Sequence, residues 1–369
     1  MAPKRPGGAG ALPKAVESPV SQSPRPADLF AALDLGTNSC RMLIARPEGS
    51  QFQVVDSFTK SVQLGAGLER SGRLSRASIG RTIHALQVCR QKLRRHNVKR
   101  MHLVATEACR RAANGASFLD RVRRETGLKL DLITPQEEAQ LAVVSCAPLV
   151  SRKTDQLLVV DIGGGSTELV WIDLTGVPRR ERARAIMRLH AGFYADTGGL
   201  PTARVVDWIS VPLGVATLRD QFHDVEDDAA RFALMSWFFE ENLAEFAPYK
   251  DEPPRDGFQI IGTSGTVTTV AASHLGLRRY DRNKVDGLRM TSDQIDKVIR
   301  SYLALGPAGR RRDPRIGTDR HALIMSGAAI LQALLRCWPT DRLSVADRGL
   351  REGMLYAQMT AAGVLDNED

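Results

Sequence analysis

Two segments far apart in the chain repeat one pattern: an apolar strand that ends in aspartate, a turn of glycine and small hydroxyl residues, and a second apolar strand. The first segment runs from about residue 30 to 45 and contains Asp34, and the second runs from about 157 to 172 and contains Asp161. Apolar runs of this length around a glycine turn predict a β-hairpin. The chain is therefore expected to hold one such hairpin in each half.

Both turns are suited to binding an anion. Glycine lets the backbone turn tightly and lets its N–H groups approach a ligand without a Cβ in the way. A single hairpin of this kind is weak support for a binding site, so the inference depends on the repetition. The groups expected to contact the anion are Asn38, Ser39, Gly163, Gly164, Gly165 and Ser166.

A third loop has the same character. A buried-type strand at 258–262 is followed by Ser264, Gly265 and Thr266, and then by a helix-like run from 267 to 275. In a strand-turn-helix arrangement, free N–H groups and the positive end of the helix dipole face an anion. The alternative is that Thr266 serves only as the helix N-cap.

The aspartates next to the first two turns indicate a metal ion. A carboxylate repels phosphate, and a divalent cation between the two removes that conflict. We expect Asp161 and Glu168, which flank the triple-glycine turn, to be the best pair of ligands, with Asp34 as a third carboxylate. Oxygen ligands of this kind suit Mg²⁺, with Mn²⁺ as the other option. The alternative for Asp34 is a turn cap.

The chain of 369 residues is long enough for two domains. Residues 1–28 are basic and rich in Pro, Gly and Ser, which predicts a disordered tail. We expect a first domain over 29–150 and a second over 151–369, with the final helix, about 350–361, able to pack back on the first. Strands and helices alternate in both, which is typical of an α/β fold. The Arg-rich stretch 173–207 is interpreted as an insertion of unknown role.

Three secondary-structure elements are predicted from local pattern. An amphipathic helix is expected from about 75 to 96, a strand from 129 to 133 and a long apolar helix near 320–337. No apolar run reaches the roughly 18 residues of a membrane span, so we expect a soluble protein. Five scattered cysteines without a Cys-x-x-Cys pair favour a reducing cytoplasm over a disulfide framework or a zinc site.

The net charge of +9 fits an acidic ligand without identifying one. Basic clusters lie at 90–100, 110–124 and 310–312, and their alternative interpretation is solvated helix faces and loops. Aromatic residues make up 5% of the chain and do not interleave with these clusters, which argues against nucleic acid. A long polyanion without bases, such as polyphosphate, remains compatible with this charge.

Six motifs in order resemble the exopolyphosphatase and guanosine pentaphosphate phosphohydrolase family in its short two-domain form. The similarity extends from about residue 30 to 360 and rests on the segments 34–39, 105–115, 137–139, 161–168, 262–266 and 350–354. The resemblance implies two ribonuclease-H-like domains, as in actin, sugar kinases and Hsp70, that face each other across a cleft. It also implies that Glu138 occupies the position of the catalytic glutamate of the family.

Helix geometry supports the same residue as a general base. Hydrolysis of a terminal phosphoanhydride needs a positioned water, a base and positive charge on the phosphoryl oxygens. Thr134 as N-cap, Pro135 at the first helical position and Glu137 form a predicted capping box, which gives Glu137 a structural role and leaves Glu138 free. The alternative is an ordinary exposed carboxylate.

Arg110 is predicted to clamp the phosphate. It follows the strand expected at 101–105, and a guanidinium fork matches phosphate oxygens. Its neighbour Arg111 would point elsewhere on a helix and is the natural control. The alternative for Arg110 is a surface ion pair.

The leading hypothesis is a Mg²⁺-dependent exopolyphosphatase that releases terminal orthophosphate from inorganic polyphosphate. The nearest alternative is a guanosine pentaphosphate 5'-phosphohydrolase, or one enzyme with both activities. More remote alternatives are an ATP-dependent small-molecule kinase of the same superfold and a non-catalytic sensor of polyphosphate or alarmone. The sequence leaves a homodimer open.

Overall fold

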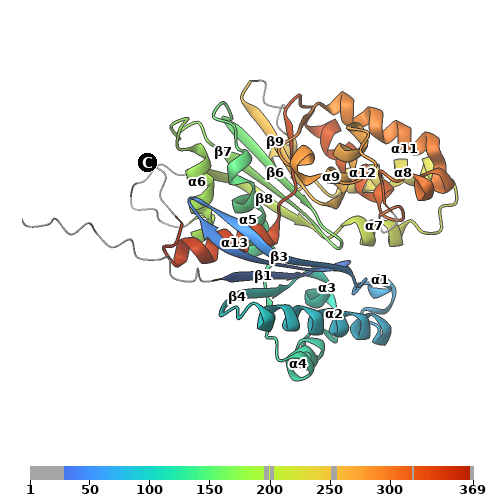
Figure 1. The fold of residues 1–369 in the computed structure, drawn as a ribbon. Coiled ribbons are helices and arrows are strands. Elements are labelled where there is room, and N and C mark those ends of the chain that lie inside the picture. The colour runs from blue at the N-terminus through green and yellow to red at the C-terminus, as the bar shows by residue number, and fades with distance from the viewer. Residues whose placement is uncertain (1–28, 195–198, 200–202, 251–255, 318–319, 366–369) are drawn as a thin grey trace, which may run out of the picture.

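The computed structural model describes residues 29–194, 199, 203–250, 256–317 and 320–365. The predicted tail over 1–28 lies outside these residues. Figure 1 shows two β-sheets, one from each half of the chain, with helices on their faces. The mixed α/β class therefore agrees with the alternation of strands and helices in the sequence.

The first sheet has the strand order β3-β2-β1-β4-β5, and β1 pairs antiparallel with β2 and parallel with β4. One of its faces packs against α2, whose N-cap is Ser75 as the predicted helix start requires. The elements of this half are β1 (Phe30–Leu35), β2 (Ser39–Glu48), β3 (Gln51–Ser61), α1 (Leu68–Ser71), α2 (Arg76–Arg95), β4 (Arg100–Ala105), α3 (Glu107–Arg111), α4 (Gly115–Thr126) and β5 (Asp131–Leu132).

The strand predicted at 129–133 is shorter than expected. Only Asp131 and Leu132 pair with β4, whereas Leu128 and Leu130 turn into the apolar core shared with α2 and α4. Burial of these two leucines draws the chain away from the sheet, because apolar packing outweighs the few hydrogen bonds of an edge strand.

The second sheet has the order β10-β11-β9-β6-β7-β8. Its strands are β6 (Gln156–Ile162), β7 (Thr167–Asp173), β8 (Arg204–Val211), β9 (Phe258–Thr263), β10 (Arg289–Met290) and β11 (Leu343–Ala346). Its helices are α6 (Arg182–Arg188), α7 (Val215–Gln221), α8 (Asp228–Glu241), α9 (Gly265–His274), α10 (Arg282–Val285), α11 (Ser292–Arg312) and α12 (Ile324–Cys337).

Two predictions in this half are corrected by the structure. The stretch 173–207 is not wholly an insertion, because its end forms β8, which pairs with β7, and its middle forms α6, which packs on α5 (Pro135–Cys146). The apolar helix expected near 320–337 begins at Ile324. Arg320 lies before it, where its Nη1 donates to the carbonyl oxygen of Gly265 at 2.9 Å.

Two helices, α5 and the final helix of the chain, lie between the sheets and face the two aspartate hairpins (Figure 1). Since strand residues alternate between faces, Asp34 shares the face of Phe30 and Ala32, which α13 (Leu350–Ala361) covers. Asp161 shares the face of Leu157 and Val159, which α5 covers. The final helix α13 therefore packs on the first sheet, and both aspartates point toward the space between the domains.

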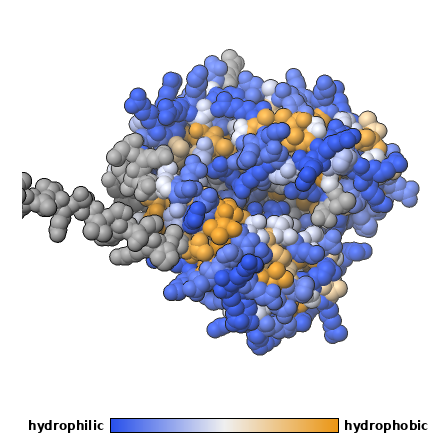
Figure 2. All heavy atoms as spheres, in the orientation of Figure 1, coloured by the Kyte–Doolittle hydropathy of each residue, from blue (hydrophilic) through white to orange (hydrophobic). Residues whose placement is uncertain are grey.

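The surface seen in Figure 2 is predominantly hydrophilic, with apolar side chains in small separate groups. Within the part of the chain that the structure describes, no helix combines the length and apolar character needed to cross a bilayer.

Candidate active site

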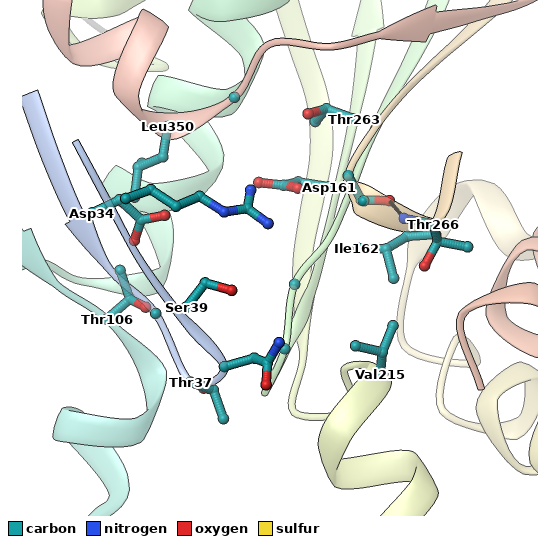
Figure 3. Close-up of a pocket in the computed structure, with 18 of the residues that line it drawn as sticks. Asp34, Thr37, Ser39, Thr106, Asp161, Ile162, Val215, Thr263, Thr266 and Leu350 are labelled. Carbon is teal, nitrogen blue, oxygen red and sulfur yellow. Dashed lines mark hydrogen bonds between the residues drawn. The ribbon is translucent and has the colours of Figure 1, made fainter. Parts of the chain in front are cut away.

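The hairpin turns, the loop before α9 and the start of α13 surround a cleft of about 310 Å³. In Figure 3, Asp34 and Ser39 approach it from the first domain, and Asp161 and Thr266 approach it from the second. Most of the predicted site residues line this cleft together: Asp34, Asn38, Ser39, Glu138, Asp161, Gly163, Gly164, Gly165, Ser166, Ser264, Gly265 and Thr266. Arg110 and Glu168 do not line it.

The triple-glycine turn packs directly against the first hairpin. A Cβ on Gly164 would lie 3.2 Å from the backbone nitrogen of Asn38, and a Cβ on Gly165 would lie 2.5 Å from Oγ1 of Thr37. Any larger residue would therefore push the two domains apart at the floor of the cleft. Close contact between the two turns is thus a second reason for these glycines, besides the approach of an anion.

Several backbone donors at the cleft are unused. The N–H groups of Asn38, Gly164, Gly165 and Gly265 donate to no acceptor among the residues that the structure describes. They belong to three different loops that meet at one place. Such convergent N–H groups can bind the oxygens of an anion.

The helix that follows the third loop begins earlier than the sequence predicts. Helix α9 begins at Gly265, two residues earlier than expected, and Ser264 is its N-cap. Oγ of Ser264 accepts hydrogen bonds from the N–H groups of Thr266 and Val267, both at 3.1 Å. Thr266 is therefore not the cap, and its side chain reaches the cleft (Figure 3).

Glu138 stands at the start of α5, where the predicted capping box is present. Oγ1 of Thr134 accepts from the N–H of Glu137 at 3.2 Å, and Oε2 of Glu137 accepts from the N–H of Thr134 at 2.7 Å. The Glu138 side chain is only 13% exposed, so it is not an ordinary surface carboxylate. Burial, followed by the charge of Glu168, raises the pKa of Glu138 well above its usual value, and Arg110 opposes this rise.

Arg110 is committed to protein acceptors. Its Nη1 donates to Oε2 of Glu138 and to the carbonyl oxygen of Ile133, both at 2.9 Å, and its Nη2 donates to Oε2 of Glu107 at 2.8 Å. This differs from the predicted phosphate clamp, and also from a surface ion pair, because the Arg110 side chain is 14% exposed. Arg110 instead fixes one oxygen of the Glu138 carboxylate.

The carboxylates of the second hairpin share one face of the sheet. Asp161 and Glu168 lie directly opposite each other on β6 and β7. Burial, with the charge of Glu138 next, raises the pKa of Asp161 to about 7, and burial and Asp161 raise the pKa of Glu168 to about 7. Oε1 of Glu168 accepts from Ser166 and Ser210, whereas its buried Oε2 has no partner among the described residues.

The expected metal site of three carboxylates stays a prediction. In the described ranges, no group of three or more His, Cys, Asp or Glu side chains is arranged to hold one ion. Asp34 belongs to the opposite wall and faces Arg41 across the β1–β2 pair, so a cation there would meet a positive charge. Asp161 and Glu168 remain as candidate ligands. Their two carboxylates repel each other, and a cation bound between them would relieve this repulsion and would give the unpartnered oxygen of Glu168 a partner. Mg²⁺ commonly binds one or two carboxylates and completes its shell with water and phosphate oxygens.

Four arginines that the sequence interpretation missed line the cleft: Arg41, Arg320, Arg348 and Arg351. The side chain of Arg41 makes no hydrogen bond or ion pair within the described part of the chain. Burial, followed by the charge of Arg351, lowers the pKa of Arg41. The antiparallel register of the first hairpin could have placed Arg41 beside Asp34. The other three reach the cleft through long-range folding, which no local pattern encodes.

A model of the Ppx/GppA phosphatase family matches residues 43–362. The chain belongs to this family. Similarity to a Ppx/GppA relative, the guanosine-5'-triphosphate,3'-diphosphate pyrophosphatase of Aeromonas salmonicida, is 27% identity over 328 residues, which cover 89% of the chain and 59% of the relative. The chain therefore spans about three-fifths of the length of such curated relatives.

Solved structures agree with the Ppx/GppA assignment. The Ppx/GppA family member of Aquifex aeolicus is 29% identical, with a TM-score of 0.70, over 91% of this chain and 99% of the other. An exopolyphosphatase from Cytophaga hutchinsonii is 21% identical, with a TM-score of 0.74, over 91% and 99%. At that identity it supports the fold alone. The predicted family and the pair of ribonuclease-H-like domains facing a cleft are thus confirmed.

Proposed function

We propose that this Ppx/GppA phosphatase is an exopolyphosphatase that releases terminal orthophosphate from inorganic polyphosphate in a Mg²⁺-dependent reaction. The observation that carries the proposal is the position of Glu138, a buried carboxylate with a raised pKa. It stands on the wall of a cleft that also carries arginines and unused backbone N–H groups.

Glu138 is suited to take a proton from the attacking water. A general base works best when its pKa lies near the operating pH, and burial moves the pKa of Glu138 in that direction. Arg110 holds Oε2 of the carboxylate, so Oε1 is left to face the water. Glu138 is the proposed catalytic base, and Arg110 is a positioning residue.

The phosphate end of the chain meets positive charge from two sources. Arg41 and Arg320 line the cleft from opposite domains, and the N–H groups of Gly164, Gly165 and Gly265 face the same space. Fixed donors of this kind stabilise the charge that develops on the phosphoryl oxygens.

Asp161 and Glu168 are the residues that would hold Mg²⁺, with Asp161 at the cleft surface and Glu168 behind it. When bound, Mg²⁺ supplies positive charge to phosphate oxygens. These two carboxylates would hold the cation from the second domain, and Asp34 belongs to the opposite wall of the cleft. Glu168 also places negative charge near Glu138, which contributes to the raised pKa of Glu138.

Two candidate substrates are separated by what surrounds the phosphates. The described residues that line the cleft include no aromatic side chain, although aromatic rings are common stacking partners of a nucleobase. This favours a chain without bases. Guanosine pentaphosphate is the second candidate, favoured by the activity for which the Aeromonas relatives are named. The family match favours a phosphatase over the kinase alternative.

Phosphate release tests this proposal. The purified full chain is assayed in parallel with polyphosphate and with guanosine pentaphosphate, with Mg²⁺ and after chelation. We expect Mg²⁺-dependent release from polyphosphate at a higher kcat/KM. Release from the guanosine substrate alone would establish the second candidate, and release unaffected by chelation would remove the metal from the account.

A further inference from the structure

A second cavity, of about 190 Å³, lies on the helical side of the second sheet between α7, α8, α11 and the start of α12. Its charged lining consists mainly of guanidinium groups. We call it the arginine cavity and define it by Arg219, Arg231, Arg310, Arg311 and Asp228. The basic run 310–312, which the cleft does not use, contributes two of these residues.

One ion pair neutralises part of this charge. Arg310 is 4% exposed and binds Asp228 with both terminal nitrogens, Nη1 at 2.8 Å and Nη2 at 2.7 Å. Nη1 of Arg310 also donates to the carbonyl oxygen of Tyr302. The negative charge of Asp228 is therefore neutralised by Arg310.

Among the described residues, none of the other three arginines has an acidic partner in the cavity lining. Within the same part of the chain, the side chain of Arg231 donates to the backbone carbonyls of Val225 and Glu226 and to nothing else. Arg311 is exposed, and its side chain has no hydrogen bond or ion pair among the residues described. Arg219 pairs with its neighbour Asp220, which is outside the lining. Arg231 and Arg311 therefore carry positive charge that no carboxylate among the described residues neutralises, and an anion with several oxygens can bind them through bidentate hydrogen bonds.

The backbone directs this arrangement. Helix α11 is broken at Gly306, whose φ is 62°, and the segment after Pro307 turns so that Arg310 and Arg311 line the cavity while Arg312 does not. The left-handed conformation at Gly306 favours glycine. The break therefore selects which arginines of the basic run reach the cavity.

The arginine cavity and the cleft share a wall. Val215 lines the cleft, and Arg219, one turn further along α7, lines the cavity. On α12, Ile324 lines the cleft and Ser326 lines the cavity. Oγ of Ser326 donates to the carbonyl oxygen of Val215 at 2.6 Å and joins the two helices at this wall.

We propose that the arginine cavity is a second phosphate-binding site, distinct from the cleft. Its ligand is a phosphate group, supplied either by the distal part of a polyphosphate chain whose end occupies the cleft or by free phosphate. The identity of the chain as polyphosphate rests on the proposed function. The cavity's affinity for phosphate rests on its own residues.

Binding to the full chain tests this proposal in an E138Q background, in which polyphosphate is consumed about 10²-fold or more slowly. We expect R219Q/R311Q to raise the Kd for long-chain polyphosphate about tenfold or more. The slope of log Kd against log salt should fall by about one to two, because two cations no longer displace counterions. Tripolyphosphate, which is short enough to bind in the cleft alone, should bind as before. R312Q is the matched control, since it removes the adjacent charge outside the cavity.

The arms separate the two sources. If R219Q/R311Q binds long-chain polyphosphate more weakly but tripolyphosphate as before, the site binds the distal part of the chain. If R219Q/R311Q instead loses the binding of inorganic phosphate, with no effect that depends on polyphosphate length, the site binds free phosphate. Unchanged binding of both probes in R219Q/R311Q, or an equal loss in R312Q, overturns the proposal. If E138Q binds no polyphosphate at all, the proposed function fails. The binding of inorganic phosphate then tests the second phosphate-binding site by itself. The single variant R311Q, which removes no side-chain hydrogen bond or ion pair among the described residues, repeats the test without risk to folding.

Discussion

Replacing Arg110 with methionine is expected to move the acidic limb of the pH–rate profile to higher pH. Nη1 of Arg110 lies 2.9 Å from Oε2 of Glu138, and both side chains are largely buried. An opposite charge at such a distance lowers the pKa of a carboxyl group by about 1–3. Removing it should raise the pKa of Glu138 by that amount, and a change of one in pKa corresponds to about 1.36 kcal/mol.

The sign of the effect follows from the role of Glu138 as a base, which requires its ionised form. Below the limb, kcat/KM of R110M should fall about tenfold for each pH unit by which the limb moves. At high pH the rate should return toward that of the parent, because Arg110 does not line the cleft. The assay is phosphate release from polyphosphate across a pH series. A loss that is equal at every pH, with an unmoved limb, would refute this reasoning and restore Arg110 as a phosphate clamp.

R111Q is the matched control for this experiment. Arg111 is the next residue on the same short helix, and its main partner is Glu69, at 2.5 Å from Nη1. It lies 3.7 Å from Glu107 and has no hydrogen bond or ion pair with Glu138. The acidic limb of R111Q should therefore stay where it is in the parent protein.

Three further outcomes are expected. The pKa of Asp161, about 7, lies above its ordinary value, so the folded state binds a proton more tightly than the unfolded state. The free energy of unfolding therefore falls as pH rises from about 4 to 7. The melting temperature of D161N should exceed that of the parent above this pH range and match it below. G165A should lower kcat/KM while circular dichroism stays native, because its Cβ would lie 2.5 Å from Oγ1 of Thr37, whereas G176A, with open space around it, should have no effect. R41Q should raise KM for polyphosphate, measured by initial rates, without lowering the melting temperature, since the Arg41 side chain has no partner to lose among the described residues.

Features encoded in a few consecutive residues were predictable. The two aspartate hairpins, the capping box of Thr134 and Glu137, and the start of α2 after Ser75 each depend on local preferences, and the structure contains them. The capping argument also separated Glu138 from Glu137, and only Glu138 lines the cleft. Local chemistry therefore identified the turns and the glutamate that line the cleft.

Features that depend on tertiary packing were not predictable. Arg348 and Arg351 reach the cleft only because α13 returns to the first domain, and Arg320 does so because the chain turns before α12. Of the two acidic partners of Arg110, Glu107 lies three positions earlier on the same helix and is within reach of a local argument. Glu138 lies 28 positions away, and nothing in the segment around Arg110 reveals it.

The most direct test of the central claim is the rate of phosphate release from polyphosphate by E138Q compared with the parent protein, with Mg²⁺ present. Glutamine keeps the shape of the side chain and cannot accept the proton of the water. We predict that kcat falls about 10²-fold or more, while polyphosphate binding stays within a few fold. Turnover by E138Q equal to that of the parent would contradict the assignment of Glu138 as the general base.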